Sequence, residues 1–164
     1  SSQSFESYLE KSYCKTASLI ANSSKAIGVL SDVDEESLKS LYFFGKQLGL
    51  AFQVVDDILD FTGNDEQLGK PAASDLQSGY LTAPVFFALE ENLTLSELIN
   101  GKFSKKDDLE KALSIVRDSG AIQKSRELAE KFASEARDSI CWLPDSPSKK
   151  ALLELPEFVI SRLY

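Results

Sequence analysis

The stretch that decides the fold lies between Gly49 and Asp75 and has the sequence GLAFQVVDDILDFTGNDEQLGKPAASD. A helix advances about 100° per residue, so the polar residues of this stretch fall within roughly one third of its circumference. These residues are Gln53, Asp56, Asp57 and Asp60, with Lys46 and Gly49 in the same sector. The apolar residues on the other side, which we expect to face the core, are Leu41, Leu48, Phe52, Val55 and Leu59. The sequence therefore predicts one helix with three carboxylates and an amide on a single polar face.

This acidic face is costly for a helix. Asp is a poor helix-interior residue, and like charges four residues apart destabilise a helix by roughly 0.2–0.5 kcal/mol per pair. A hard divalent cation reverses that repulsion, and Mg²⁺ typically takes one or two carboxylates together with phosphate oxygens. The pattern by itself leaves a second interpretation open, in which the carboxylates form a solvated acidic surface.

The segment after this helix predicts a phosphate-binding loop. Residues 65–75 have no apolar period and contain Gly69, Pro71 and Ser74, which indicates a loop. Lys70 stands between Gly69 and Pro71, and a lysine ammonium binds phosphate as a point charge. Carboxylates for a metal and a lysine for phosphate together predict a metal–diphosphate site, whereas a loop lysine alone is equally compatible with a solvated charge.

Four blocks of the sequence, in order from Tyr8 to the last residue, together carry a resemblance to a known protein family. They are YLEKSYCKTASLIANS (8–23), FQVVDDILDFTG (52–63) with the following LGKP and SD, GYLTAPVFFALEE (79–91) and VISRLY (159–164). Together they resemble the trans-isoprenyl diphosphate synthases, and within that family the long-chain, solanesyl-type branch of cyanobacteria and plastids. The first block resembles the lysine–threonine helix of the family, and the second resembles its second aspartate-rich region.

The resemblance implies an all-α fold, the helical bundle of the isoprenoid synthases, of which residues 1–164 form the C-terminal half. Family members carry another aspartate-rich motif and an arginine pair well upstream of the lysine–threonine helix, and nothing in residues 1–55 resembles them. The chain also begins with Ser-Ser and contains no methionine. We therefore expect that an upstream half is missing and that these residues alone turn over little or no substrate.

The resemblance also implies a metal and diphosphate site. Asp56 is expected to ligate a Mg²⁺ ion that bridges the allylic diphosphate, with Asp57 and Asp60 supporting the metal directly or through water. Lys15 and Lys70 are expected to balance the charge of the departing diphosphate. From the residues alone, Lys15 is also compatible with a surface lysine whose stem packs on the helix.

Three further side chains complete the site that the resemblance implies. Thr16 and Gln53 are expected to place dipoles near the developing carbocation, and Phe52 is expected to form an aromatic wall. Gln53 joins Lys15 and Lys70 as an expected substrate-binding residue. Without the resemblance, Thr16 is simply a neutral helix residue.

The implied reaction joins an allylic diphosphate to isopentenyl diphosphate, with Mg²⁺ as cofactor, to make a long-chain polyprenyl diphosphate for quinone side chains. The family also leads us to expect a homodimer in the bacterial cytoplasm or the plastid stroma. Three alternatives stay open: a shorter-chain geranylgeranyl synthase, a non-catalytic partner subunit of a heteromeric synthase, and a plain helical interaction module. A silent subunit need not keep Lys15, Gln53, Lys70 and the three aspartates, so their presence argues against the second alternative.

Composition excludes several other classes of function. A net charge of −8 leaves no basic face for nucleic-acid phosphates. The absence of histidine excludes Ser–His or Cys–His nucleophilic catalysis and histidine–zinc sites within this chain. The apolar runs are too short for a transmembrane segment. Cys14 and Cys141 lack CxxC spacing, so we expect them to be buried small hydrophobes in a reducing compartment.

The apolar periodicity predicts helices almost throughout and no strands. We expect a helix from Phe5 to about Ile27 and a long one from about Glu35 to Phe61, and the acidic residues 32–36 to be charges at the start of the latter rather than a calcium loop. We also expect a helix that starts near Thr82, and a capping box at 104–107 before a helix through Leu113. A helix from Ala121 to Trp142 should follow. After a break at Pro144 and Pro147, we expect a last helix from Lys149 to Leu163.

Overall fold

The structure is a computed structural model that describes residues 4–63, 74–105 and 107–164. All regular elements in this described part are helical, which confirms the all-α prediction. The elements in chain order are α1 (Phe5–Ser12), η1 (Tyr13–Ala17), α2 (Ser18–Leu30), α3 (Glu35–Thr62), α5 (Ser74–Gln77), α6 (Ala83–Glu91), α7 (Leu93–Asn100), α8 (Asp108–Asp118), α9 (Ala121–Ser139) and α10 (Pro147–Ser161).

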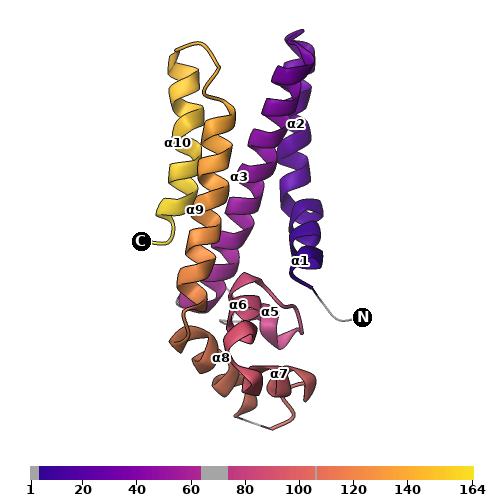
Figure 1. The fold of residues 1–164 in the computed structure, drawn as a ribbon, viewed down its shortest axis with the longest axis vertical. Helices are drawn as coiled ribbons and strands as arrows, with labels where there is room; N and C mark the ends of the chain where they lie inside the picture. The colour runs from indigo at the N-terminus through magenta and orange to yellow at the C-terminus, as the bar shows by residue number, and fades with distance from the viewer. Residues whose placement is uncertain (1–3, 64–73, 106) are drawn as a thin grey trace. The chain divides into compact units, whose positions relative to one another are not determined.

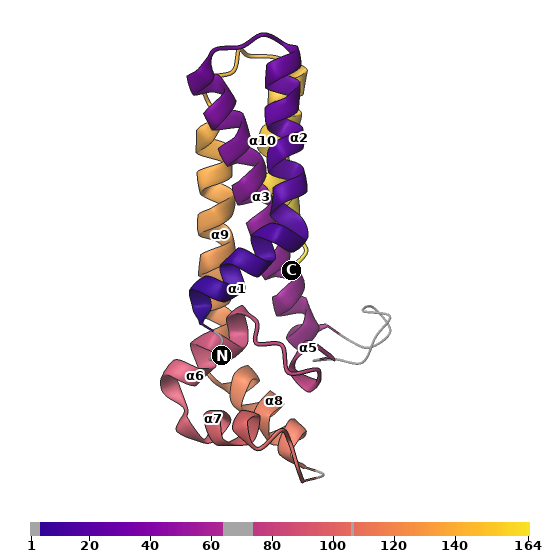
Figure 2. The ribbon, with the colours of Figure 1, turned by 90° about the vertical axis from the view of Figure 1, so that its right-hand side faces the viewer.

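The chain divides into two compact units. The first unit comprises residues 1–8 and 56–127, and the second comprises residues 9–55 and 128–164. Within the second unit, α2 and α3 lie side by side and antiparallel, as do α9 and α10 (Figures 1 and 2). The last turns of α3, which carry the acidic motif, belong to the first unit.

Two glycines of α3 allow the close approach of α2 and η1 in the second unit. A Cβ atom added to Gly45 would lie 2.5 Å from the carbonyl oxygen of Ile20, and one added to Gly49 would lie 2.5 Å from the Cα atom of Ala17. Both distances are well inside van der Waals contact, so only glycine fits at these positions without movement of the backbone. The backbones of η1 and α3 can therefore approach more closely than larger residues would permit.

The first unit has a small core of its own. Phe61 at the end of α3 packs with Leu76 of α5, Val85 of α6, Leu95 of α7 and Val116 of α8, all of them buried. The Arg117 guanidinium donates a hydrogen bond from Nε to the carbonyl oxygen of Phe61 over 2.9 Å. A cation at the carbonyl end of a helix is favourable, so α8 stabilises the end of α3 next to the acidic motif.

The long central helix was predicted correctly. Helix α3 begins at Glu35, where the Asp34 carboxylate accepts a hydrogen bond from the Ser37 N–H over 2.9 Å, as an N-cap residue does. It continues to Thr62, one residue beyond the predicted end, and Gly63 follows. The acidic residues before this helix thus act as N-terminal charges, as expected.

Other boundaries differ from the predictions for local reasons. The expected helix from Phe5 to Ile27 extends to Leu30 and contains the π-helical turn η1, which apolar periodicity does not show. The last helix begins at Pro147, inside the predicted break, because proline is favoured at the first helical position and Ser146 caps it. The last two residues of the expected loop, Ser74 and Asp75, instead begin α5. The predicted capping box is displaced, because the side chain that accepts from the Lys105 N–H is that of Asp108.

The prediction that the cysteines are buried was wrong. Cys14 and Cys141 are both exposed free thiols. Cys14 lies in η1, and Cys141 follows the end of α9. Packing partners rather than residue type decide burial at such positions.

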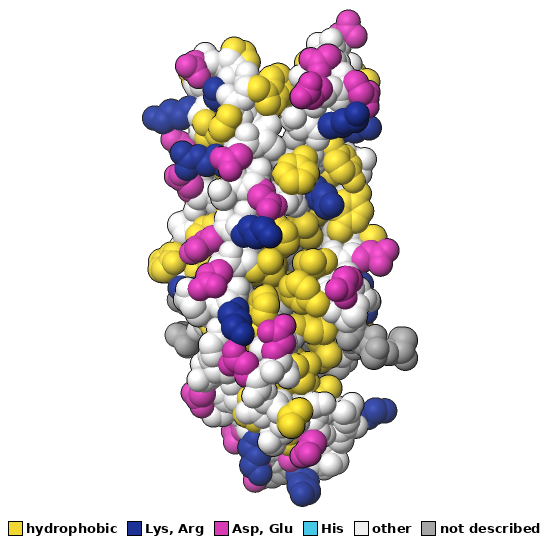
Figure 3. All heavy atoms as spheres, viewed as in Figure 1, with side chains coloured by type: hydrophobic (Ala, Val, Ile, Leu, Met, Phe, Trp, Pro, Cys, Tyr) yellow, Lys and Arg dark blue, Asp and Glu magenta, His cyan; other side chains and the backbone are white. Residues whose placement is uncertain are grey.

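The second unit also presents large apolar side chains to solvent. Figure 3 shows hydrophobic side chains gathered along α2 and α3 on the viewed face, whereas most charged side chains lie on the surrounding surface. On α2, Leu19 is 75% exposed and Leu30 is 87% exposed. Contiguous exposed apolar surface is characteristic of a region that binds another macromolecule or chain segment.

Candidate functional site

The acidic motif lies on the last two turns of α3 and is largely buried. Asp57 is 3% exposed and Asp60 is 1% exposed, whereas Asp56 is partly accessible. The Tyr8 hydroxyl donates to Oδ2 of Asp57 over 2.7 Å, and the backbone nitrogen of Asp75 lies 3.5 Å from Oδ2 of Asp60. A charged group is costly to bury without hydrogen bonds or a counter-charge. The polar face that the sequence predicted is therefore enclosed by the fold.

The lysine–threonine segment forms the π-helical turn η1 in the second unit. Its N–H to carbonyl bond runs from Ser18 to Tyr13, five residues back. Turns of this kind insert one extra residue into a helix and are frequent at functional sites. Lys15 projects into solvent, and Thr16 is partly buried.

Thr16 and Gln53 contact each other directly. The Thr16 hydroxyl donates from Oγ1 to Oε1 of Gln53 over 2.7 Å, and the Gln53 side chain is 7% exposed. The close approach at Gly49, one turn before Gln53, brings η1 near enough for this bond. The structure thus brings together two residues that were assigned to the same role.

Phe52 does not face the core as the predicted apolar stripe required. It is 36% exposed, and the guanidinium carbon of Arg162 lies 4.7 Å from the centroid of its ring, an ordinary cation–π distance. The stripe prediction was wrong here because the apolar side of α3 that is fully buried carries Ala51, Val54 and Ile58, which point away from Phe52. Sequence reasoning missed both Arg162 and Tyr8 as neighbours of the predicted site residues, since neither contact is local in the chain.

Lys70, the predicted phosphate-binding lysine, lies outside the described residues. The described basic residue of the predicted site is therefore Lys15.

The carboxylates provide the hard oxygen donors that Mg²⁺ prefers. Among the residues that the structure describes, no three acidic, cysteine or histidine side chains converge as a complete protein cage for a metal ion. Mg²⁺ is commonly held by one or two carboxylates, with phosphate oxygens and water completing its coordination. Asp56, Asp57 and Asp60 therefore fit an ion shared with a diphosphate, and they do not fit an ion enclosed by protein alone.

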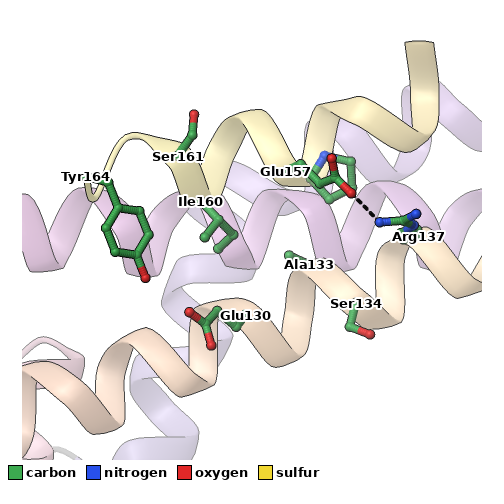
Figure 4. A pocket seen from close by; sticks show the side chains of 9 residues that line it. Glu130, Ala133, Ser134, Arg137, Glu157, Ile160, Ser161 and Tyr164 are labelled. Carbon is green, nitrogen blue, oxygen red and sulfur yellow. Dashed lines mark hydrogen bonds and ion pairs between the residues drawn. The ribbon is translucent and has the colours of Figure 1, made fainter. Parts of the chain in front are cut away.

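Two cavities of the second unit lie apart from these residues. One, of about 420 Å³, lies between α9 and α10, with the Arg137–Glu157 ion pair on one side and Tyr164 near the chain end (Figure 4). Another, of about 510 Å³, is lined by Tyr13 of η1 and by residues of α1, α3 and α9, among them Tyr42. Neither cavity is lined by a predicted site residue.

Comparison with known proteins places the chain in a family. The polyprenyl synthetase family model matches residues 1–116. The prenyl transferase of Synechocystis sp. is 54% identical over 159 residues, which cover 97% of this chain and 49% of that protein. Solanesyl diphosphate synthase 2, chloroplastic, of Arabidopsis thaliana is 48% identical over 158 residues, 96% of this chain and 38% of that protein.

A solved structure agrees with these relatives. The polyprenyl synthase from Caulobacter crescentus CB15, complexed with calcium and isoprenyl diphosphate, has a TM-score of 0.86 and 34% identity, covering 96% of this chain and 50% of that one. This chain belongs to the polyprenyl synthetase family, which confirms the resemblance and the isoprenoid-synthase fold. It spans about half the length of the Synechocystis relative. Within the described residues, every helix is too short or too polar to pass through a lipid bilayer.

Proposed function

We propose that this chain acts in a trans-prenyltransferase that joins an allylic diphosphate to isopentenyl diphosphate. The observation that carries the proposal is the burial of Asp57 and Asp60 on α3, in a chain of the polyprenyl synthetase family. Burial of carboxylates argues against the alternative of a solvated acidic surface, because water would stabilise their charge at no such cost. A site that binds a cation together with diphosphate oxygens gives these carboxylates a role.

The proposal assigns roles to the chain's own side chains. Asp56, the most accessible of the three aspartates, would bind Mg²⁺ together with the diphosphate, and Asp57 and Asp60 would support the ion directly or through water. Lys15 pairs with the diphosphate, with Lys70 in the same role. A bound Mg²⁺ would supply the positive charge that makes diphosphate a better leaving group.

The Thr16–Gln53 pair is proposed to act on the hydrocarbon end of the substrate. Its hydrogen bond orients the amide dipole of Gln53, and preorganised dipoles stabilise developing charge more effectively than mobile water does. Phe52 is proposed as an aromatic wall, with the Arg162 guanidinium stacked on its ring.

We propose a long, solanesyl-like product for quinone side chains. The support is the 48% identity to a chloroplastic solanesyl diphosphate synthase. A shorter, geranylgeranyl product is the alternative that the assay below distinguishes. Mg²⁺ as the natural cation, a homodimer, and a place in a bacterial cytoplasm or plastid stroma are parts of the same proposal.

We also propose that residues 1–164 function together with a further region, comparable in size to the part of the relatives that this chain does not match. The exposed apolar side chains of α2, among them Leu19 and Leu30, support this because such surface usually binds a partner. Without that region we expect weak Mg²⁺–diphosphate binding and little or no turnover.

The test supplies Mg²⁺, farnesyl diphosphate and labelled isopentenyl diphosphate, and separates the products by chain length. The chain is assayed alone and after co-expression with the remainder of the Synechocystis relative. We expect long-chain product only in the second case. Absence of product in both cases would favour a non-catalytic partner subunit.

Two variants of this chain make the test specific. Asp56→Ala should abolish product formation and the thermal stabilisation by Mg²⁺ and diphosphate, while helix content by circular dichroism is unchanged. Asp107→Ala removes an equally acidic but exposed residue before α8 and should leave both intact. Equal behaviour of the two variants would instead support an acidic surface or a plain helical module.

A further inference from the structure

Tyr8 makes a long-range contact with the acidic motif that has no part in the roles assigned so far. Its hydroxyl on α1 donates to Oδ2 of Asp57 over 2.7 Å, and the two residues are 49 positions apart in the chain. Tyr8 is 7% exposed and Asp57 is 3% exposed. Because both residues are almost fully buried, little water competes for this hydrogen bond.

The Tyr8 ring is held by aromatic packing within the first unit. Its centroid lies 5.7 Å from that of Phe5 and 5.9 Å from that of Phe86. Phe5 in turn packs edge-on against Phe86 at 5.8 Å and contacts Phe87 at 5.6 Å. These distances are typical of stabilising aromatic pairs, so α1 and α6 together determine where the Tyr8 hydroxyl lies.

A fixed donor also fixes the carboxylate that it binds. With Oδ2 of Asp57 oriented toward Tyr8, rotation of the carboxyl group is restricted and the direction of Oδ1 is determined as well. Hydrogen-bonding partners of metal-binding carboxylates commonly have this effect, and their loss typically weakens metal binding by about 10–100-fold.

We propose that Tyr8 is a positioning residue for the acidic motif. Its hydroxyl holds Asp57 in the orientation in which that carboxylate faces a divalent cation bound with diphosphate, directly or through water. The inference rests on the proposed function, because it assigns Tyr8 to the same cation–diphosphate site. It adds a residue of α1 to the three carboxylates that α3 contributes to that site.

The test measures metal affinity rather than turnover. Mn²⁺ replaces Mg²⁺ because it also prefers carboxylate and phosphate oxygens, and free Mn²⁺ is quantified by its electron paramagnetic resonance signal in the presence of inorganic pyrophosphate. Tyr8→Phe keeps the packed ring and removes only the hydroxyl. The matched control is Tyr42→Phe, which removes a hydroxyl that is likewise hydrogen-bonded, to Tyr13 over 2.6 Å in the second unit.

We expect Tyr8→Phe to weaken Mn²⁺ binding about tenfold and Tyr42→Phe to leave it unchanged. In an Asp57→Asn background, Tyr8→Phe should change the affinity by less than about twofold, because its effect acts through the Asp57 carboxylate. Circular dichroism below the melting transition verifies that each variant is folded. A general loss of stability would not produce this dependence on Asp57.

The outcomes separate the two proposals. If Asp56→Ala abolishes Mn²⁺ binding and Tyr8→Phe binds as tightly as the unchanged chain, the role of Tyr8 is refuted and the proposed function stands. If the unchanged chain binds no Mn²⁺ with pyrophosphate, or Asp56→Ala binds it equally well, both proposals are wrong.

Discussion

The hydroxyl of Thr16 donates a hydrogen bond to the side-chain oxygen of Gln53 across 2.7 Å, joining the π-helical turn η1 to helix α3. The bond orients the Gln53 amide with its oxygen toward Thr16. It depends on the absence of a side chain at Gly49, where η1 and α3 come closest. Gly49, which has no side chain, thus determines how Thr16 and Gln53 lie relative to each other.

Thr16→Val should destabilise the protein by about 1 kcal/mol, because it removes this bond and retains the shape of the side chain. The measurement is the free energy of unfolding from urea titration. Thr94→Val, at an exposed position of α7, is the control and should change stability by less than about 0.5 kcal/mol. Equal stability of the two variants would show that the Thr16–Gln53 bond contributes nothing measurable.

Gly49→Ala should be more costly, by about 1–3 kcal/mol, since the new methyl group would overlap the backbone of Ala17 and force the two helices apart. Gly120→Ala is the matched control. Among the described residues, nothing lies within 4 Å of a Cβ atom at Gly120, and this variant should be neutral or slightly stabilising. A Gly49→Ala protein as stable as Gly120→Ala would contradict the close approach of η1 and α3.

Asp34 should make stability dependent on pH in the acid range. Hydrogen bonds from the backbone N–H and then the side chain of Ser37 lower the pKa of its carboxyl group below the ordinary value. A carboxyl whose pKa is lower in the folded protein stabilises it above the pKa of the unfolded chain, and this contribution is lost as pH falls through the folded pKa. Asp34→Ala should therefore lower the melting temperature at neutral pH, and the difference from the unchanged chain should shrink in acid.

The control for Asp34 is Asp107→Ala. Asp107 stands before α8 without a side-chain capping bond, so Asp107→Ala should lower the melting temperature at neutral pH by less than Asp34→Ala does. If the melting temperatures of Asp34→Ala and the unchanged chain differed by the same amount throughout the acid range, the lost stability would be unrelated to the charge of the Asp34 carboxylate.

Both thiols should react in the folded protein. Cys14 and Cys141 are exposed and free, so a thiol reagent should label two groups without denaturant. The comparison is the number of groups labelled after addition of denaturant, which should be unchanged. If labelling required unfolding, the two cysteines would be buried in the folded protein, as the sequence predicted.

Local sequence was sufficient for several helix boundaries of this protein. The start of α3 at Glu35, its end near Gly63 and the break before Ala121 follow from capping residues, glycine and apolar periodicity. It was insufficient for η1, because one inserted residue leaves the surrounding period almost unchanged. It also misplaced the capping acid before α8, since Asp107 and Asp108 are equally suited by residue type and only the turn geometry selects Asp108.

The sequence by itself determined the residue types of the candidate site and their order on one helix, because a helix converts spacing into direction. Tertiary structure alone decided that Asp57 and Gln53 are buried while Phe52 is partly exposed. It also decided the partners, Tyr8 for Asp57 and Thr16 for Gln53, which are 49 and 37 positions away in the chain. The physical reason is that burial and long-range hydrogen bonds depend on which helices pack together, and helical periodicity specifies a face of α3 without specifying what covers it.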